Sequence, residues 1–216
     1  DTSGNQAQLP FEPESVVAYE AGLKSEWLNN DLLLNVTLFR SEYSNLQVST
    51  NSNPGGGAFV ALVRNAAESI SQGLEIETRW NPTNNLRLGA QITLLDAHYV
   101  SYIEAPVTAE QRAQGKPNQD LSGRPTQFAP NWSGSLNQSY VFDLPNDYNL
   151  TAELTEIFSS SFYLRAEDDP VAKQPSYTRL DARLSLEKPG GRLGFDLIGK
   201  NLTNEIIRTS QATLGS

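Results

Sequence analysis

The chain has 216 residues, with 16 lysines and arginines against 25 aspartates and glutamates, so its formal net charge is -9 at pH 7. This balance argues against a nucleic-acid-binding protein, because such a protein needs a basic face. Cysteine is absent and His98 is the single histidine. Disulfides, thiolate metal sites and clusters of imidazole ligands are therefore excluded within this chain.

No apolar run approaches the roughly 18 residues that a transmembrane helix requires. The sequence opens on Asp1 without a signal peptide, and it contains no methionine, the residue with which a natural open reading frame starts. We therefore expect a processed or partial chain.

The first predicted element is a β-hairpin at residues 13–47, with two alternating apolar and polar runs joined by a polar turn at 29–31. Trp27 lies beside the turn, and Phe39 and Tyr43 lie towards the other end. An apolar face, a polar face and aromatic residues at both ends are typical of a membrane β-hairpin. In the second run, Leu32, Leu34, Val36 and Leu38 point one way, and Leu33, Asn35, Thr37 and Phe39 point the other.

The rest of the chain continues this period of two. Leu74, Ile76 and Trp80 share one face of their run, whereas Glu75 and Glu77 lie on the other. The pattern predicts an all-β fold, an antiparallel transmembrane β-barrel. The eight predicted strands are about 15–28, 32–48, 58–80, 86–103, 130–143, 148–165, 177–187 and 192–201.

The connections between these strands alternate strictly between short and long. Outer-membrane barrels show this alternation, with short periplasmic turns and long extracellular loops. The short turns are at 29–31, 81–85, 144–147 and 188–191; the long connections are at 49–57, about 104–129, about 166–176 and from 202 onward.

Aromatic residues gather near both ends of the predicted strands, as in the two interfacial girdles of a membrane barrel. A soluble β-sandwich with aromatic strand ends is the alternative. Acidic side chains distinguish the membrane barrel from the sandwich, because a carboxylate facing the dry core of a sandwich would need a hydrogen-bonding or charged partner. The set near the short turns is Trp27, Trp80, Phe142 and Tyr148; the set near the long loops is Phe59, Tyr99, Tyr102, Trp132, Phe162, Tyr163 and Tyr177.

Several motifs, in order, resemble the barrel of TonB-dependent outer-membrane receptors. The resemblance covers about residues 13–205. It is carried by the order and spacing of the motifs, since each alone is weak. They are Pro13-Glu14, 19–24 (YEAGLK), Leu38-Phe39, 43–47 (YSNLQ), Asn65-Ala66, 73–77 (GLEIE), 95–99 (LDAHY), 121–123 (LSG) with Pro130, and 199–204 (GKNLTN).

This resemblance implies a barrel of about twenty-two antiparallel strands closed by an N-terminal plug domain. It also implies a motif that engages the periplasmic protein TonB, and uptake of a scarce nutrient driven by the inner-membrane proton gradient. Residues 1–216 would form a partial barrel domain of about eight strands, without the plug, the TonB-contacting motif or the terminal strand. A small barrel of eight strands closed on itself is the less favoured alternative.

No catalytic residues are predicted, and no metal site or cofactor. With one histidine, a Ser-His-Asp triad could use only His98, which lies among girdle tyrosines. Glu75 and Glu77 are expected to face a hydrated lumen and to pair with Arg79 or Arg87. The acidic run at 167–169 lacks the alternating ligand spacing of a calcium site and is expected to be a solvated loop tip.

The predicted ligand-binding residues lie at or near the long loops. Arginine and lysine suit an anionic chelate, and tyrosine suits an aromatic or sugar face. The alternative places the tyrosines in a lipid-facing girdle and the cations in solvent. The six candidates are Tyr99, Tyr102, Arg112, Lys116, Arg124 and Arg165.

The sequence thus predicts a receptor, not an enzyme, in the outer membrane of a Gram-negative bacterium. Its expected partners are TonB, through a segment absent here, a ferric siderophore or another small nutrient, and outer-membrane lipid. We expect a monomeric barrel when complete. Three alternatives stay open: a receptor of the same class for a carbohydrate, cobalamin or other nutrient, a passive porin-like channel, and a soluble β-sandwich binding module.

Overall fold

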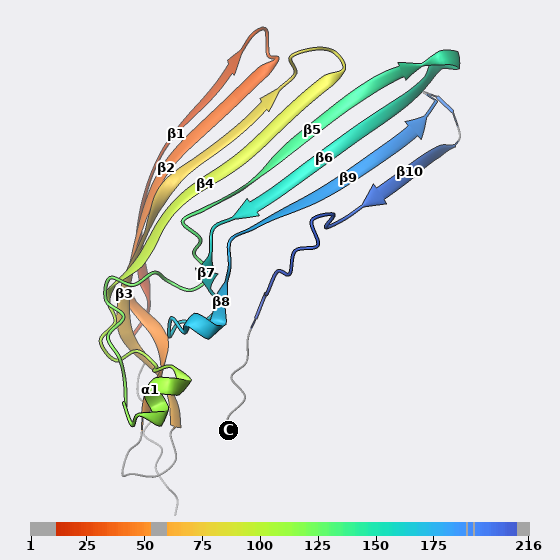
Figure 1. Cartoon of the computed structure of the whole chain (residues 1–216). Coiled ribbons are helices and arrows are strands. Elements are labelled where there is room, and N and C mark those ends of the chain that lie inside the picture. The colour runs from red at the N-terminus through yellow and green to blue at the C-terminus, as the bar shows by residue number, and fades with distance from the viewer. Residues whose placement is uncertain (1–11, 53–59, 189, 192, 211–216) are drawn as a thin grey trace, which may run out of the picture.

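The computed structural model describes residues 12–52, 60–188, 190–191 and 193–210. Its main feature is one antiparallel sheet of eight strands in the order β1-β2-β3-β4-β5-β6-β9-β10, drawn as a curved wall in Figure 1. The predicted all-β fold and the eight predicted strands are confirmed. The strands are β1 (Ser15–Trp27), β2 (Leu32–Ser52), β3 (Val60–Trp80), β4 (Leu86–Ser101), β5 (Trp132–Leu144), β6 (Tyr148–Ser159), β9 (Tyr177–Glu187) and β10 (Gly194–Gly199).

The sheet is open at both edges. Within the described residues, β1 pairs with β2 alone and β10 with β9 alone. The alternative of eight strands closing on themselves is therefore wrong for this structure.

Two strand boundaries differ from the prediction by more than two residues. β2 continues to Ser52 because it pairs with β3 up to Ser52↔Val60, so residues 49–52 of the predicted long connection are strand. The run predicted at 148–165 stops at Ser159, where the chain reaches the start of β5 and its pairing with that strand ends. Two further residues, Phe162–Tyr163, form the short strand β7, which pairs with β8 (Lys173–Gln174).

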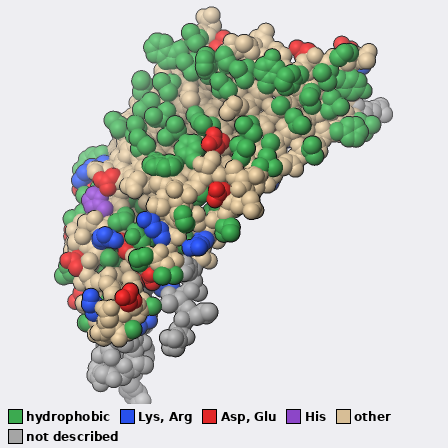
Figure 2. Space-filling model, viewed as in Figure 1, with side chains coloured by type: hydrophobic (Ala, Val, Ile, Leu, Met, Phe, Trp, Pro, Cys, Tyr) green, Lys and Arg blue, Asp and Glu red, His purple; other side chains and the backbone are tan. Residues whose placement is uncertain are grey.

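The sheet has one apolar and one polar face, as the alternating pattern predicts. Directly paired residues share a face, and Leu38, Leu74, Leu94 and Trp132 form one row across four strands. Their large side chains are half-exposed, 58% for Leu38 and 46% for Leu94. We call this side the outer face; Figure 2 shows its hydrophobic side chains spread over the strands.

The neighbouring row, Thr37, Glu75, Thr93 and Ser133, lies on the opposite side, which we call the inner face. Glu77 accepts a hydrogen bond there from Asn35 (3.1 Å), the residue that faces it on β2. Glu77 thus pairs with the side-chain amide of Asn35 in place of the predicted arginine, Arg79 or Arg87. Carboxylates on one face of an open sheet suit a wet lumen.

Short turns join the strands at one end and loops join them at the other (Figure 1). The predicted turn at 29–31 is confirmed; Leu28, Asn29 and Asn30 all have positive φ, which turns a chain sharply. A 3₁₀ turn, η1 (Pro145–Asp147), joins β5 to β6. No helix in the described part of the chain is long and apolar enough to cross a membrane.

The aromatic residues near the short turns are exposed on the outer face, as predicted for Trp27, Trp80, Phe142 and Tyr148. Near the loops the prediction is wrong for Tyr99 and Tyr102. Both are buried, whereas Trp132 is exposed beside Leu94. Phe59 lies outside the described residues.

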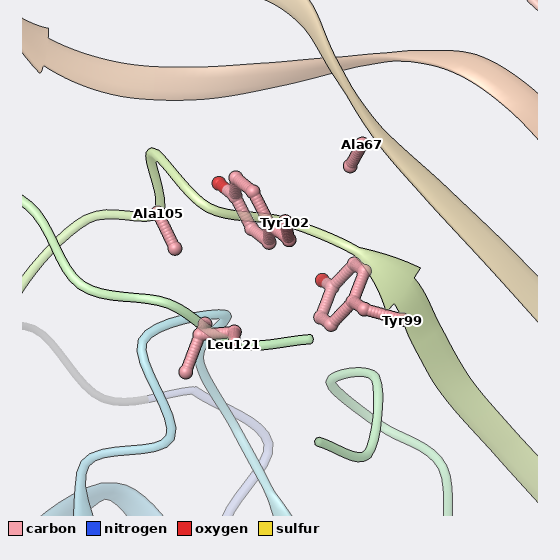
Figure 3. Packing of buried hydrophobic residues seen from close by; sticks show 5 residues of the cluster. All are labelled: Ala67, Tyr99, Tyr102, Ala105 and Leu121. Carbon is pink, nitrogen blue, oxygen red and sulfur yellow. The ribbon is translucent and has the colours of Figure 1, made fainter. Parts of the chain in front are cut away.

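The buried core lies at the loop end and not inside the sheet. It consists of Ala67, Tyr99, Tyr102, Ala105 and Leu121, which face one another in Figure 3. A bulge in β2 at Asn45, whose φ is +58°, shifts the register so that Leu46 pairs with Ala67. Two loops cover this core: the β4–β5 loop (102–131), which contains α1 (Ala109–Ala113), and the β6–β9 loop (160–176).

Candidate functional site

A cavity of about 450 Å³ lies between the two loops and the end of the sheet. Four of the six predicted ligand-binding residues line it: Tyr99, Tyr102, Arg112 and Arg165. They come from β4, the chain just after it, α1 and the β6–β9 loop. The other lining residues are Gln47, Val48, Pro106, Val107, Gln127, Leu164, Ala166 and Glu167.

The two tyrosines form the apolar wall of this cavity. Their ring centroids are 4.9 Å apart with the ring planes tilted by 57°, and they are only 5% and 1% exposed. Tyr99 pairs with Ser69 and lies on the inner face with Thr93, so the alternative of a lipid-facing girdle is wrong for this residue. Burial raises the pKa of the Tyr102 phenol, which keeps it neutral.

Arg112 is a cation on an ordered helix at the rim. α1 starts in a capping box, in which Thr108 accepts from the backbone of Gln111 (3.2 Å) and the Gln111 side chain accepts from that of Thr108 (3.0 Å). The side chain of Gln111 also donates to Gln119 (3.0 Å). Arg112 is exposed and makes no ion pair with another described residue, so its guanidinium is available to an anion.

Arg165 is placed differently, since it already holds a carboxylate. It forms an ion pair with Glu167, which is buried and also lines the cavity. The neighbouring Asp168 accepts from Nε of Arg124 in the β4–β5 loop at 3.0 Å. Burial of Asp168 raises the pKa of its carboxyl, and Arg124 only partly opposes that shift.

The expected solvated loop tip at 167–169 is therefore wrong for two of its three residues. Glu167 and Asp168 are buried because the β6–β9 loop packs onto the β4–β5 loop. Gln119 donates to the carbonyl of Glu167 (2.9 Å), and the amide of Phe128 donates to the carbonyl of Tyr163 (2.8 Å). Asp169 instead accepts from Val171 and caps the 3₁₀ turn η2 (Pro170–Ala172).

The remaining two predicted residues do not line the cavity. Lys116 is exposed beyond α1, and the guanidinium of Arg124 is engaged by Asp168. Three further lining residues were not predicted to bind ligand: Glu167, Gln47 and Gln127. Glu167 and Gln127 lie in irregular segments that no periodic pattern marks, and Gln47 lies in β2, where the pattern does not reveal the loops that fold next to it.

A second hollow, of about 540 Å³, lies on the inner face of the sheet. Hydroxyl and amide groups of Gln91, Thr93 and Ser133 line it together with aromatic rings, and none of its lining side chains is charged. The rings of Phe128 and Phe162 lie 6.2 Å apart at its edge. The hollow is thus uncharged and partly aromatic, whereas Glu75 and Glu77 carry charge elsewhere on the inner face.

Neither the cavity nor the hollow carries a cluster of metal ligands. Within the described ranges, no three histidine, cysteine, aspartate or glutamate side chains gather closely enough to hold a metal ion. The single histidine, His98, lies beside Asp96 at 2.9 Å. Both residues point to the outer face, where Gln72 donates to Asp96 (3.0 Å).

Comparisons with known proteins agree with this architecture. The family model described as "TonB dependent receptor-like, beta-barrel" matches residues 1–202. The metal-pseudopaline receptor CntO of Pseudomonas aeruginosa is 30% identical over 138 residues, which is 64% of this chain and 16% of that receptor. The chain therefore spans about a sixth of the length of the curated relatives that it matches.

Solved structures show the same fold. The ferric yersiniabactin uptake receptor FyuA from Yersinia pestis aligns with a TM-score of 0.70 at 17% identity, covering 94% of this chain and 27% of that receptor. The siderophore receptor PiuA from Acinetobacter baumannii aligns with a TM-score of 0.62 at 20% identity, covering 88% and 24%. At such identities the likeness concerns the fold alone.

Proposed function

The chain belongs to the TonB-dependent receptor β-barrel family, and we propose that its protein takes up a ferric siderophore across the outer membrane of a Gram-negative bacterium. In this proposal the protein is a transport receptor and not an enzyme. TonB energises uptake through a segment outside the described strands. The complete barrel acts as a monomer, with its outer face in lipid.

The observation that carries the proposal is the cavity at the loop end. It presents one exposed arginine, Arg112, and a second, Arg165, beside a wall of tyrosine rings. Guanidinium groups bind carboxylate and phenolate oxygens with good geometry, and aromatic rings pack against the flat parts of a chelate. A metal chelate of low molecular weight carries both kinds of group, anionic oxygens and flat parts that a ring can pack against.

The comparisons support a metal chelate over other nutrients. FyuA and PiuA are named for ferric yersiniabactin uptake and for siderophores, and CntO for a metal-pseudopaline complex. A carbohydrate or cobalamin receptor of the same family is the second candidate for uptake experiments. The family match favours an energised receptor over a passive porin. The open eight-stranded sheet, beside which only the two-stranded β7–β8 pair is described, argues against a soluble sandwich.

Uptake measurements test the proposal. Deletion of the full gene should abolish accumulation of a labelled ferric siderophore, and the intact gene should restore it. Normal iron uptake by the deletion strain, with loss of sugar or cobalamin uptake, would redirect the substrate. Uptake that persists when TonB is removed would point instead to a passive channel.

A pair of variants links the activity to the cavity. Arg112→Gln should weaken binding of the anionic chelate about tenfold, as expected for the loss of one charge-assisted hydrogen bond. Lys116→Gln removes the same charge from the same loop but outside the cavity, so its affinity should stay at the wild-type value. Equal affinities for the two variants would contradict this site.

A further inference from the structure

Two neighbouring acidic residues in the β6–β9 loop each hold an arginine. Glu167 pairs with Arg165 of its own loop, and Asp168 pairs with Arg124 of the β4–β5 loop at 3.0 Å. We call these four residues the loop latch. The first pair lies in the lining of the cavity, whereas the second connects the two loops that cover it.

The second pair is unusual because the buried carboxylate of Asp168 has few hydrogen-bond partners. Its side chain is only 3% exposed, and only Oδ2 contacts Arg124. The other oxygen, Oδ1, is buried and has no hydrogen-bond partner among the described residues. Asp168 also has a φ of +54°, which an aspartate adopts at some cost. A buried carboxylate with one unmatched oxygen destabilises the closed arrangement that contains it.

The charged groups around Asp168 do not offset the free-energy cost of burying its carboxylate. Arg124 and Lys173 of β8 favour the ionised carboxylate, while Glu167 next to it and the buried Tyr99 phenol of β4 also face it. Burial has the largest effect and raises the pKa of the carboxyl. The closed loop therefore binds a proton more tightly than the open loop does, and its stability decreases as the pH rises from about the ordinary value of 3.8.

Glu167 occupies the position that a ligand carboxylate would take on Arg165. A ligand carboxylate that binds the Nε edge of Arg165 must displace this side chain, because Nε carries a single N–H and Glu167 accepts from it. The displaced carboxylate then lies next to Asp168 without its arginine. Its negative charge further destabilises the buried Asp168, since like charges repel strongly where water is excluded.

We propose that Arg124 keeps the β6–β9 loop closed over the cavity by neutralising the buried Asp168, and that an anionic ligand opens the loop by displacing Glu167 from Arg165. The nature of the ligand rests on the proposed function, but the closed state does not. An ordinary salt bridge would open when either partner is removed. The loop latch should respond differently to its two partners, because Asp168 costs free energy when ionised and Arg124 does not.

Distances between the loops test the closed state in the full-length receptor. Spin labels are placed at Gln114→Cys on the β4–β5 loop and at Val171→Cys, an exposed position on the β6–β9 loop, and residues 1–216 contribute no other cysteine. Double electron–electron resonance then reports the separation. Arg124→Gln should lengthen and broaden it, whereas Asp168→Asn should keep the closed distance. Asp168→Asn that opens the loops as far as Arg124→Gln would overturn the latch.

Binding of citrate, used without metal as a tricarboxylate probe, tests the release step. Citrate should open the labelled loops of the wild type, and Glu167→Gln should bind citrate about tenfold more tightly because the Nε of Arg165 then faces a neutral amide in place of a competing carboxylate. Glu110→Gln is the matched control, since Glu110 is an exposed acid on α1 whose carboxylate accepts a hydrogen bond from Gln114 (3.4 Å) and does not line the cavity. Failure of citrate to open the wild type, or equal affinities for the two glutamine variants, would overturn the release step.

These readouts separate the latch from the proposed function. The loop distances of Arg124→Gln and Asp168→Asn need no ligand and no transport. The proposed function depends instead on siderophore uptake and on Arg112, which is not part of the loop latch. Either proposal can therefore fail while the other stands.

Discussion

In the sheet, Leu38 and Leu94 are about half-exposed, whereas at the loop end Tyr102 and Ala105 are 1% and 0% exposed. Among the described residues, the strands have no buried core of their own away from the loop end. Backbone hydrogen bonds between neighbouring strands hold the sheet together. Its outer face suits contact with lipid, and its inner face suits contact with water. The loops, by contrast, pack as a small globular protein does, with apolar residues inside and buried polar groups that find partners.

This difference teaches where each region gains its stability. A membrane strand does not need to be covered by protein, so its outer side chains stay exposed until lipid surrounds them. A loop that stands in water has to bury its own apolar groups. We expect substitutions in the two regions to be detected by different measurements, and four predictions test that expectation.

Tyr102→Ala should have the largest effect, and only at the loop end. Loss of a large, fully buried aromatic side chain typically costs about 3–5 kcal/mol, and here it removes the centre of the Ala67–Leu121 cluster. The loops of the assembled receptor should become sensitive to protease, while the barrel keeps its heat-modifiable mobility on gels. Tyr148→Ala, at an exposed position beside a short turn, serves as the control. Protease resistance in both variants would contradict a packed loop end.

Ile92→Arg should impair assembly in the membrane, because Ile92 lies in the apolar outer row between Ile76 and Gly134. Arginine near the middle of the lipid-facing band costs about 2–4 kcal/mol. Gln91→Arg is the matched variant one residue earlier, on the inner face opposite Glu77. It should assemble normally as judged by urea titration in lipid vesicles. The reverse order of stabilities would mean that the two faces have been assigned the wrong way round.

Gly73→Ala should destabilise the sheet by about 1–3 kcal/mol, the usual range for overpacking. A Cβ at this position would lie 2.2 Å from the carbonyl oxygen of Leu94 and 2.9 Å from the Phe39 ring. Gly22→Ala is the control, because its Cβ would approach nothing closer than 3.5 Å. Equal unfolding midpoints in urea would show that β3 and β4 can move apart at this point.

Thr108→Ala should have the smallest effect and should again be local. It removes the side chain that caps α1, for which about 0.5–2 kcal/mol is typical. We expect faster hydrogen exchange in residues 109–113 and no change in the strands. Ser122, whose hydroxyl accepts from the amide of Tyr102 (3.0 Å), provides a comparison, since Ser122→Ala should affect the tyrosine pair and not α1.

Much of the eight-stranded sheet was predictable from the sequence. The alternation of Leu74 and Ile76 with Glu75 and Glu77 fixes two faces, and a sheet with a period of two leaves little freedom in register once the turns are placed. Asn29 and Asn30 marked a turn because asparagine tolerates positive φ better than most residues. These are local properties, so neighbouring residues are enough to reveal them.

The candidate site was predictable only in part. Tyr99, Tyr102, Arg112 and Arg165 were singled out because they lie close to long loops, and the structure places all four around one cavity. Their surroundings could not be predicted. The burial of Glu167 and Asp168 depends on how two loops fold onto each other through contacts 48 and 44 residues apart in the sequence.

By itself, the sequence determined the class of fold, the alternation of short and long connections and the family, because each is written in repeats and motifs along the chain. Tertiary structure alone decided that the tyrosines are buried, that Arg124 is occupied by Asp168, and that Arg165 already holds a carboxylate. The physical reason is that strand faces follow from the geometry of one backbone, whereas burial and ion pairing in loops depend on contacts between segments far apart in the chain.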